Sequence, residues 1–141
     1  ELDLFDATDE PAVLQAHHRG WYIDLERPGE KILGTPAVMD GRLLVTSFAP
    51  PETLGNACAP NLGTSYLYAL DVFSARPALA PDTLDEDPER SIELDIRGIP
   101  PPVSIVFDET RPGNPSVFAG TESVDVLEAR KSRERVYWVS D

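Results

Sequence analysis

The chain has 141 residues and a formal net charge of −13, because 25 Asp and Glu residues outnumber 12 Lys and Arg residues. Such an acidic surface repels phosphate groups, which argues against nucleic acids and anionic membranes as partners. No apolar run is long enough to cross a bilayer, so membrane insertion is not expected. The 14 prolines and 9 glycines are scattered, which favours short strands joined by turns over long helices.

The beginning of the chain suggests that it is a processed product or a piece of a longer protein. It starts at Glu1 rather than Met and carries no secretory signal. Residues 1–18 are acidic and are expected to form a linker or an edge segment, with one short helical turn near residues 9–16. Residues 19–141 are expected to form the folded part, beginning with an extra strand at 21–25 that contains Trp21 and Tyr22.

The strongest local signal is a hairpin near the middle of the chain. Two apolar runs at 36–39 and 42–48 are separated by Asp40-Gly41, a dipeptide typical of two-residue hairpin turns. A third strand is predicted at 65–72, after a long irregular loop. A fourth is predicted at 91–96, where apolar and acidic residues alternate with the period of a half-buried strand.

The second half repeats this order weakly, with strands expected at 103–107, 117–121, 124–129 and 136–139. We therefore predict an all-β chain of two four-stranded antiparallel units, at about 34–97 and 98–141, like two blades of a β-propeller. Two blades would leave large apolar faces open, which suggests a fragment of a larger propeller. A self-contained β-sandwich is the alternative, because sandwiches also have short strands and frequent turns.

No residue set points to catalysis or to a metal. Adjacent His17 and His18 would face opposite sides of a strand, and no third ligand stands at a plausible spacing. No Gly-x-Ser-x-Gly sequence is present to place a nucleophile. Aspartates at strand ends or turns are expected to cap backbone donors rather than to act as acid–base pairs: Asp24, Asp40, Asp71 and Asp108. The prediction is a protein without enzymatic activity.

An ordered series of motifs resembles the PilY-type proteins found at the tip of type IV pili. It covers residues 19–138 and consists of GWYIDL (20–25), GEKI (29–32), TPAV (35–38), GRLLVTSF (41–48), NLG (61–63), YLYALD (66–71), GIP (98–100) and RVYW (135–138). The YALD strand alone is shared by quinoprotein-like propellers of many functions. The whole ordered series is more specific.

This resemblance implies a modified β-propeller that is exported through the periplasm and placed at the pilus tip or cell surface. It implies roles in pilus biogenesis, surface attachment and twitching motility. The partners would be minor pilins, the rest of the parent propeller, and a host or abiotic surface. Members often carry a calcium-binding loop, but the acidic run at 85–89 lacks the glycine and the final carboxylate of such a loop. No cofactor is therefore expected in this segment, and calcium would bind elsewhere in the parent.

The loop at 50–63 is the predicted partner-binding segment, because it is long and has no periodicity. The candidate contact residues are Pro50, Pro51, Leu54, Asn56, Pro60 and Asn61. Cys58, the single cysteine, cannot form an internal disulfide; it is a free thiol or pairs with a cysteine outside this chain, as the resemblance implies. Two alternative functions remain: a fragment of a quinoprotein-like dehydrogenase, and a general protein-interaction propeller.

Overall fold

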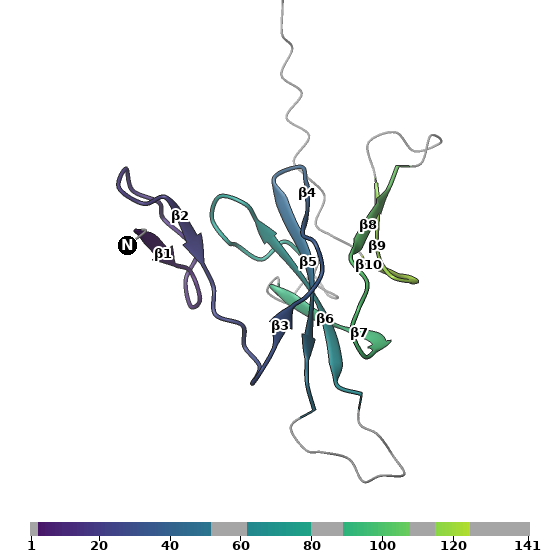
Figure 1. The fold of residues 1–141 in the computed structure, drawn as a ribbon. Helices are drawn as coiled ribbons and strands as arrows, with labels where there is room; N and C mark the ends of the chain where they lie inside the picture. The colour runs from purple at the N-terminus through teal and green to yellow at the C-terminus, as the bar shows by residue number, and fades with distance from the viewer. Residues whose placement is uncertain (1–2, 52–61, 80–88, 108–114, 125–141) are drawn as a thin grey trace, which may run out of the picture.

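A computed structural model describes residues 3–51, 62–79, 89–107 and 115–124 of the chain. These residues form three layers of β-structure (Figure 1), and no helix occurs among them, which confirms the all-β prediction. The strands are β1 (Leu4–Asp6), β2 (Gly20–Tyr22), β3 (Lys31–Ile32), β4 (Ala37–Met39), β5 (Arg42–Ala49), β6 (Thr64–Asp71), β7 (Ser91–Arg97), β8 (Val103–Val106), β9 (Ser116–Ala119) and β10 (Glu122–Val124). Consequently, none of the described residues belongs to a helix that could cross a membrane.

The central layer is an antiparallel meander of β4, β5, β6 and β7, with β3 pairing with the far end of β5. The four strands predicted for the first unit are all present, and their ends differ from the prediction by at most one residue. Strand β3 was not predicted, because two residues are too short to show a period. The antiparallel pairing of the four predicted strands is thus confirmed, and β3 makes the sheet five-stranded.

The predicted Asp40-Gly41 hairpin is also confirmed. Met39 pairs with Arg42, so the loop between β4 and β5 has two residues. Asp40 has a φ of 49° and Gly41 a φ of 75°. Positive φ at both central residues defines a type I′ turn, whose twist matches that of the flanking strands.

The second sheet is an antiparallel meander of β8, β9 and β10. Its order follows the weak internal repeat, since β8, β9 and β10 occupy the places of β4, β5 and β6. The predicted strand at 124–129 begins earlier than expected, at Glu122, because Gly120 (φ 63°) and Thr121 form a two-residue turn after β9. The rest of that strand and the predicted strand at 136–139 lie outside the described residues.

The N-terminal segment differs from its prediction in two respects. The helical turn expected near residues 9–16 does not form, because Ala12 instead packs beside Ala7 and Ala75 and its N–H donates to the carbonyl of Ser74 at 2.7 Å. The strand expected at 21–25 ends at Tyr22, where it stops pairing in parallel with β1. Residues 1–18 were predicted to be a linker or an edge segment. Among them, β1 is one of the two strands of the small β1–β2 sheet.

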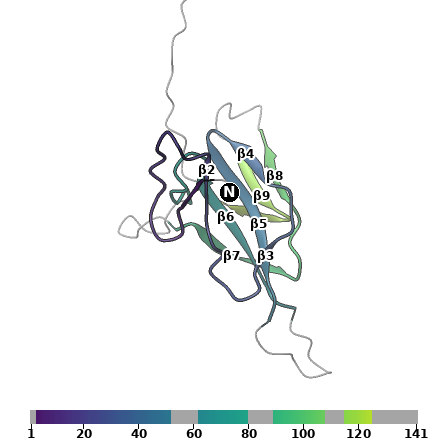
Figure 2. The ribbon, with the colours of Figure 1, turned by 60° about the vertical axis from the view of Figure 1, so that its left-hand side comes forward.

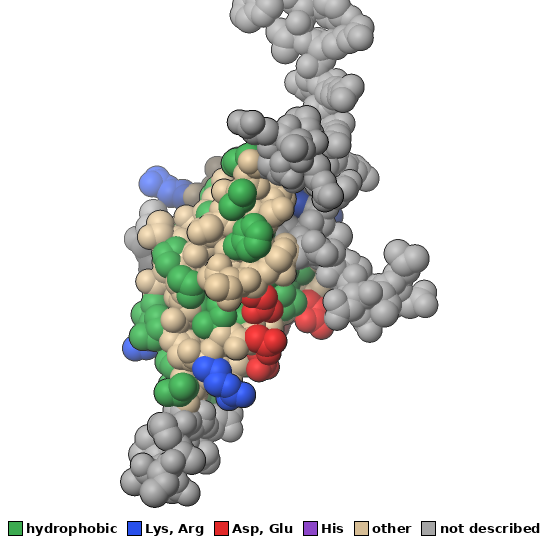
Figure 3. All heavy atoms as spheres, turned by 90° about the vertical axis from the view of Figure 1, so that its right-hand side faces the viewer, with side chains coloured by type: hydrophobic (Ala, Val, Ile, Leu, Met, Phe, Trp, Pro, Cys, Tyr) green, Lys and Arg blue, Asp and Glu red, His purple; other side chains and the backbone are tan. Residues whose placement is uncertain are grey.

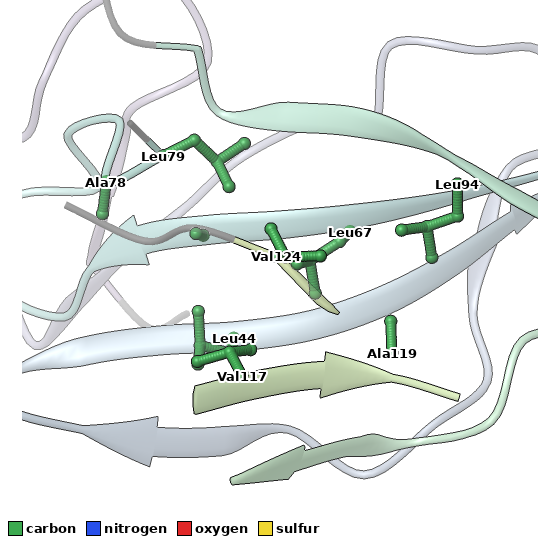
Figure 4. Packing of buried hydrophobic residues seen from close by; sticks show 9 residues of the cluster. Leu44, Leu67, Ala78, Leu79, Leu94, Val117, Ala119 and Val124 are labelled. Carbon is green, nitrogen blue, oxygen red and sulfur yellow. The ribbon is translucent and has the colours of Figure 1, made fainter. Parts of the chain in front are cut away.

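The main core lies between the central sheet and the second sheet. Alternation along each strand sends apolar side chains from both sheets into this space (Figure 4). The buried residues of this core are Leu44, Leu67, Ala69, Ala78, Leu79, Leu94, Val117, Ala119 and Val124. The β8–β10 sheet is therefore packed face to face on the central one.

The opposite face of the central sheet is covered by the N-terminal segment. Turning the molecule brings this segment in front of the sheet (Figure 2). Trp21 fastens it, because its indole N–H donates to the carbonyl of Val72 at 2.7 Å and its ring packs beside Ala7 and Ala75. Both faces of the central sheet are thus covered within the described part of the chain.

Gly41 and Gly63, which lie beside the two ends of β5, allow a matched test of backbone strain and crowding. Gly41 and Gly63 have φ values of 75° and 74°. A Cβ on Gly41 would meet nothing within 4 Å, whereas one on Gly63 would lie 2.5 Å from the carbonyl oxygen of Ala49. Gly41→Ala is expected to cost about 1–2 kcal/mol of unfolding free energy from the left-handed backbone alone. Gly63→Ala is expected to cost a further ~1–3 kcal/mol from overpacking. Urea denaturation of both variants measures the difference, and equal costs would contradict the described approach of Gly63 to Ala49.

Candidate functional site

The most developed polar arrangement lies where the N-terminal segment crosses the central sheet. Arg27 and Glu30 come from a turn made by Pro28 and Gly29, whose φ of 71° suits glycine. The N–H of Glu30 donates to the carbonyl of Arg27 at 3.1 Å and closes the turn. Both side chains point at polar residues of the sheet: Ser47 of β5, Tyr66 and Tyr68 of β6, and Ser91 of β7. We call these six residues the polar cluster.

Glu30 is the centre of the polar cluster, and its side chain has no solvent-exposed surface. Its Oε1 accepts a hydrogen bond from the hydroxyl of Ser47. Its Oε2 accepts from the Tyr68 hydroxyl at 3.2 Å and from the backbone N–H of Arg27 at 3.3 Å. The Arg27 guanidinium lies 3.5 Å away and balances the charge. These contacts satisfy both oxygens of the buried carboxylate.

Arg27 contacts two neighbouring strands, β6 and β7, through its guanidinium. Its Nη1 donates to the Tyr68 hydroxyl at 3.1 Å, and its Nη2 donates to the Ser91 hydroxyl at 3.3 Å. Its Cζ lies 3.6 Å from the centre of the Tyr66 ring, a cation–π contact. The guanidinium is therefore held by planar contacts that a lysine could not reproduce.

Burial of Tyr68, together with the nearby charge of Glu30, raises the pKa of its phenol to about 12, although Arg27 acts in the opposite direction. The folded state therefore keeps the phenol proton over a pH range in which the unfolded chain loses it. The contribution to stability is complete below pH 10 and is lost as the pH rises through about 12.

We expect the free energy of unfolding to decrease as the pH rises from 10 to about 12. In Tyr68→Phe this decrease should be smaller, because the variant has no phenol at this position. The ultraviolet difference spectrum between the wild-type protein and Tyr68→Phe reports the ionisation of Tyr68 alone. A midpoint of ionisation near pH 10 would contradict the described environment of Tyr68.

The polar cluster does not have the form of a catalytic centre. A serine beside a carboxylate resembles a nucleophile and its base, but Ser47 and the Glu30 side chain are both completely buried, so a substrate could not reach them. Every buried polar side-chain atom among the described residues has a hydrogen-bond partner. The hydrogen bonds of the polar cluster therefore anchor the N-terminal segment to the central sheet.

A shallow cleft of about 610 Å³ opens beside the polar cluster. It is lined by Asp9, Pro11, Glu26, Arg27, Pro77, Glu89, Arg90 and Ser91. Both guanidinium groups are engaged within the protein, since Arg90 donates to the carbonyl of Thr8 and Arg27 belongs to the polar cluster. The cleft also contains three acidic residues, Asp9, Glu26 and Glu89, of which Glu26 pairs with Arg27. This charge suits contact with a polar or basic surface better than anion binding.

The outer face of the β8–β10 sheet is a second candidate for contact. Alternation places Ser104, Val106, Ser116, Phe118 and Ser123 on the face turned away from the core. None of these five residues is charged, although the chain as a whole carries a net charge of −13. Seen from this side, hydrophobic side chains are scattered among uncharged polar side chains and backbone, and acidic and some basic side chains lie toward the lower part of the view (Figure 3). An uncharged outer face is what packing against a further sheet requires.

The predicted aspartate caps have mixed outcomes. Asp71 is confirmed as a cap, because its Oδ1 accepts hydrogen bonds from the N–H groups of Phe73 and Ser74 and from the Ser74 hydroxyl. Partial burial would raise the pKa of Asp71, but these hydrogen bonds outweigh it and lower the pKa. Asp40 supplies the positive φ of the hairpin turn. Asp24 is an exposed residue whose own N–H donates to Thr8, and Asp108 lies outside the described residues.

The predicted partner-binding loop is described only at its two ends, residues 50–51 and 62–63. Pro50 is exposed and Pro51 is partly exposed. The other named residues of this loop lie outside the described residues: Leu54, Asn56, Cys58, Pro60 and Asn61. Their role in partner binding, and the external disulfide of Cys58, stay predictions.

His17 and His18 were expected to lie on a strand and to face opposite sides of it. This expectation is wrong. His17 belongs to a turn before β2, and the centres of the His17 and His18 rings are 4.1 Å apart. The rings therefore lie side by side rather than on opposite faces. Asp3 lies close to both, which the separation of 14 residues concealed in the sequence.

The polar cluster was not predicted from the sequence. The hydrogen bonds that join Arg27 and Glu30 to the sheet span 17 to 64 residues, and they follow from the way the N-terminal segment folds over the sheet. One signal was present, since Tyr66 and Tyr68 stand two residues apart and must share a face of their strand.

Comparisons with known proteins give no match: no family model, no curated protein and no solved structure is similar to the chain.

Proposed function

We propose that this chain is a non-enzymatic part of a type IV pilus tip adhesin and assembly factor, and that its two sheets are neighbouring blades of a β-propeller. The function would be mechanical and adhesive. A rigid body presents loops to a host or abiotic surface, and the same body docks on minor pilins and on the rest of the propeller. The ordered motifs from GWYIDL at 20–25 to RVYW at 135–138 point to pili.

The proposal that the two sheets are neighbouring blades is supported by one observation. Two antiparallel meanders stack on each other, and their strands follow the order of the internal repeat. In a propeller, each blade packs a face on the next blade along the chain. The central sheet has both faces covered, by the N-terminal segment and by β8–β10. The outer face of β8–β10 is uncharged, and Val106 on that face is 51% exposed, as the docking surface of a further blade would be before assembly.

A pair of valine substitutions tests this proposal in a piliated bacterium that encodes the chain. Val106→Asp places a charge on the outer face of β8–β10. Val38→Asp is the matched control, because Val38 is 62% exposed on β4 and lies away from that face. Val106→Asp is expected to reduce piliation, surface attachment and twitching, while Val38→Asp leaves them unchanged. Normal piliation and motility after deletion of the whole segment would contradict the proposed function.

A fragment of a quinoprotein-like dehydrogenase is the first alternative, and it rests only on the shared YALD strand at 68–71. It would be supported by a quinone absorbance after reconstitution together with turnover of an alcohol. A general interaction propeller is the second alternative. Its distinguishing result is a pull-down with the complete protein that recovers partners but no minor pilin.

A further inference from the structure

The N-terminal segment brings three metal-binding side chains together outside the polar cluster. The ligand atoms of Asp3, His17 and His18 all lie within 4.8 Å of one another. His17 Nε2 is 3.7 Å from the nearer carboxylate oxygen of Asp3. We propose that Asp3, His17 and His18 form a binding site for a nitrogen-preferring divalent metal ion such as Zn²⁺. This proposal is independent of the proposed pilus function.

The fold itself builds this site from distant parts of the chain. Strands β1 and β2 pair in parallel, with Leu4 opposite Gly20, so the residues that precede each strand also lie together. The N–H of Arg19 donates to the carbonyl of Asp3 at 2.9 Å and fixes the backbone of Asp3 beside the histidines. The three ligands thus come from two segments that the sheet holds in register.

The histidine side chains are oriented by further contacts. The N–H of His18 donates to the carbonyl of Gln15 at 2.9 Å and closes the turn that contains His17. The His18 ring meets the edge of the Phe5 ring at a centre distance of 5.5 Å and an angle of 81°. These contacts restrict the rotation of His18, which lowers the entropy lost on binding an ion.

The donor set selects the class of metal. Two imidazole nitrogens and one carboxylate suit Zn²⁺ and similar ions, whereas Ca²⁺ and Mg²⁺ prefer oxygen ligands alone. Tetrahedral zinc with bonds of about 2.0–2.1 Å needs its ligand atoms ~3.3 Å apart, so the three groups must close by about an ångström. Asp3 and His17 are 59% and 56% exposed and can rotate to do so. A fourth position would stay open to water.

Metal binding at His18 would break one hydrogen bond of the protein. The N–H of Gln15 donates to Nδ1 of His18 at 3.0 Å, so the neutral ring carries its proton on Nε2. A metal bound through either nitrogen requires this hydrogen bond to break, because Nδ1 must take the metal or the proton. The Gln15 amide should therefore report occupancy of the site directly.

Titration of the full 141-residue chain with Zn²⁺ tests the proposal. The chain carries Cys58→Ser and a blocked amino end, so that neither the thiol nor the amine competes. His17 and His18 are the only histidines, so their imidazole NMR signals are unambiguous. We expect one ion per chain, with shifts of both imidazoles and of the Gln15 amide. Calorimetry should show His17→Ala, His18→Ala and Asp3→Asn each weakening binding at least about tenfold, since even partners outside a ligand set are worth about 10–100-fold.

Asp24→Asn is the matched control, because it removes the same charge from an exposed residue of the same segment, outside the three-residue group. It should leave the affinity for Zn²⁺ within about twofold of the unsubstituted chain, as expected of a weak, screened charge effect. The absence of Zn²⁺ binding would overturn the proposal and leave Asp3 and His17 as a simple surface contact. Binding that survives all three ligand substitutions would overturn it equally.

Discussion

Leu67→Ala is expected to lower the free energy of unfolding by about 3 kcal/mol, within the range of 2–5 kcal/mol for such a truncation in a packed core. Leu67 has no exposed surface and lies between the two sheets, where its side chain meets residues of both (Figure 4). The loss includes both the transfer of the removed methyl groups and the cavity that remains. Urea denaturation measures it by linear extrapolation.

A second substitution shows whether this cost depends on the contact between the sheets. Val117 lies on β9, in the same buried core as Leu67. The double variant Leu67→Ala, Val117→Ala should differ from the sum of the single variants by at least ~0.5 kcal/mol, because residues of one packed cluster couple through the cavity they share. Val38→Ala, at an exposed position, serves as the control and should cost within about 0.5 kcal/mol. Strict additivity together with a Leu67→Ala cost below ~1 kcal/mol would show that the sheets do not pack as described.

Glu30→Ala is the other substitution with a large expected effect, also about 3 kcal/mol. It leaves the buried Ser47 hydroxyl without its acceptor and removes one partner each from Tyr68 and Arg27. Each buried polar group that loses its partner costs about 1–3 kcal/mol. Glu30→Gln should cost less, because its carbonyl oxygen still accepts a hydrogen bond.

Glu26→Ala is the control for Glu30→Ala. Its carboxylate also lies near Arg27, with 3.6 Å between Glu26 Oε2 and Nη2, but its side chain is 56% exposed. An exposed pair of this kind is worth about 0–1 kcal/mol. The two variants remove the same charge beside the same guanidinium and differ in burial. Similar costs for both would contradict the assignment of Glu30 as the buried centre of the polar cluster.

The sequence predicted the sheets where its local signals were strong. Asp40-Gly41 defines a two-residue turn by backbone geometry alone, and the alternation of Ile92, Leu94 and Ile96 with acidic residues marks one buried face of β7. Strand β3 and the parallel pairing of β1 with β2 gave no such signal. They are short, and parallel pairing depends on contacts between segments that lie apart in the chain.

The polar cluster was not predictable for a related physical reason. Glu30 appears in the sequence as one acidic residue among 25 acidic residues, and only the fold brings Ser47 and Tyr68 to it. The same holds for Asp3 and the two histidines, which were interpreted as if they lay on a strand. The partner-binding role of the loop at 50–63 stays a prediction.

The structure of the longest protein product that contains this sequence, determined by electron cryomicroscopy or crystallography, tests the central proposal most directly. The proposal predicts that residues 34–97 and 98–141 are neighbouring blades of a closed ring, and that another four-stranded blade covers Val106 and Phe118. A structure in which the central sheet and β8–β10 form a separate sandwich, with that outer face in solvent, would contradict it.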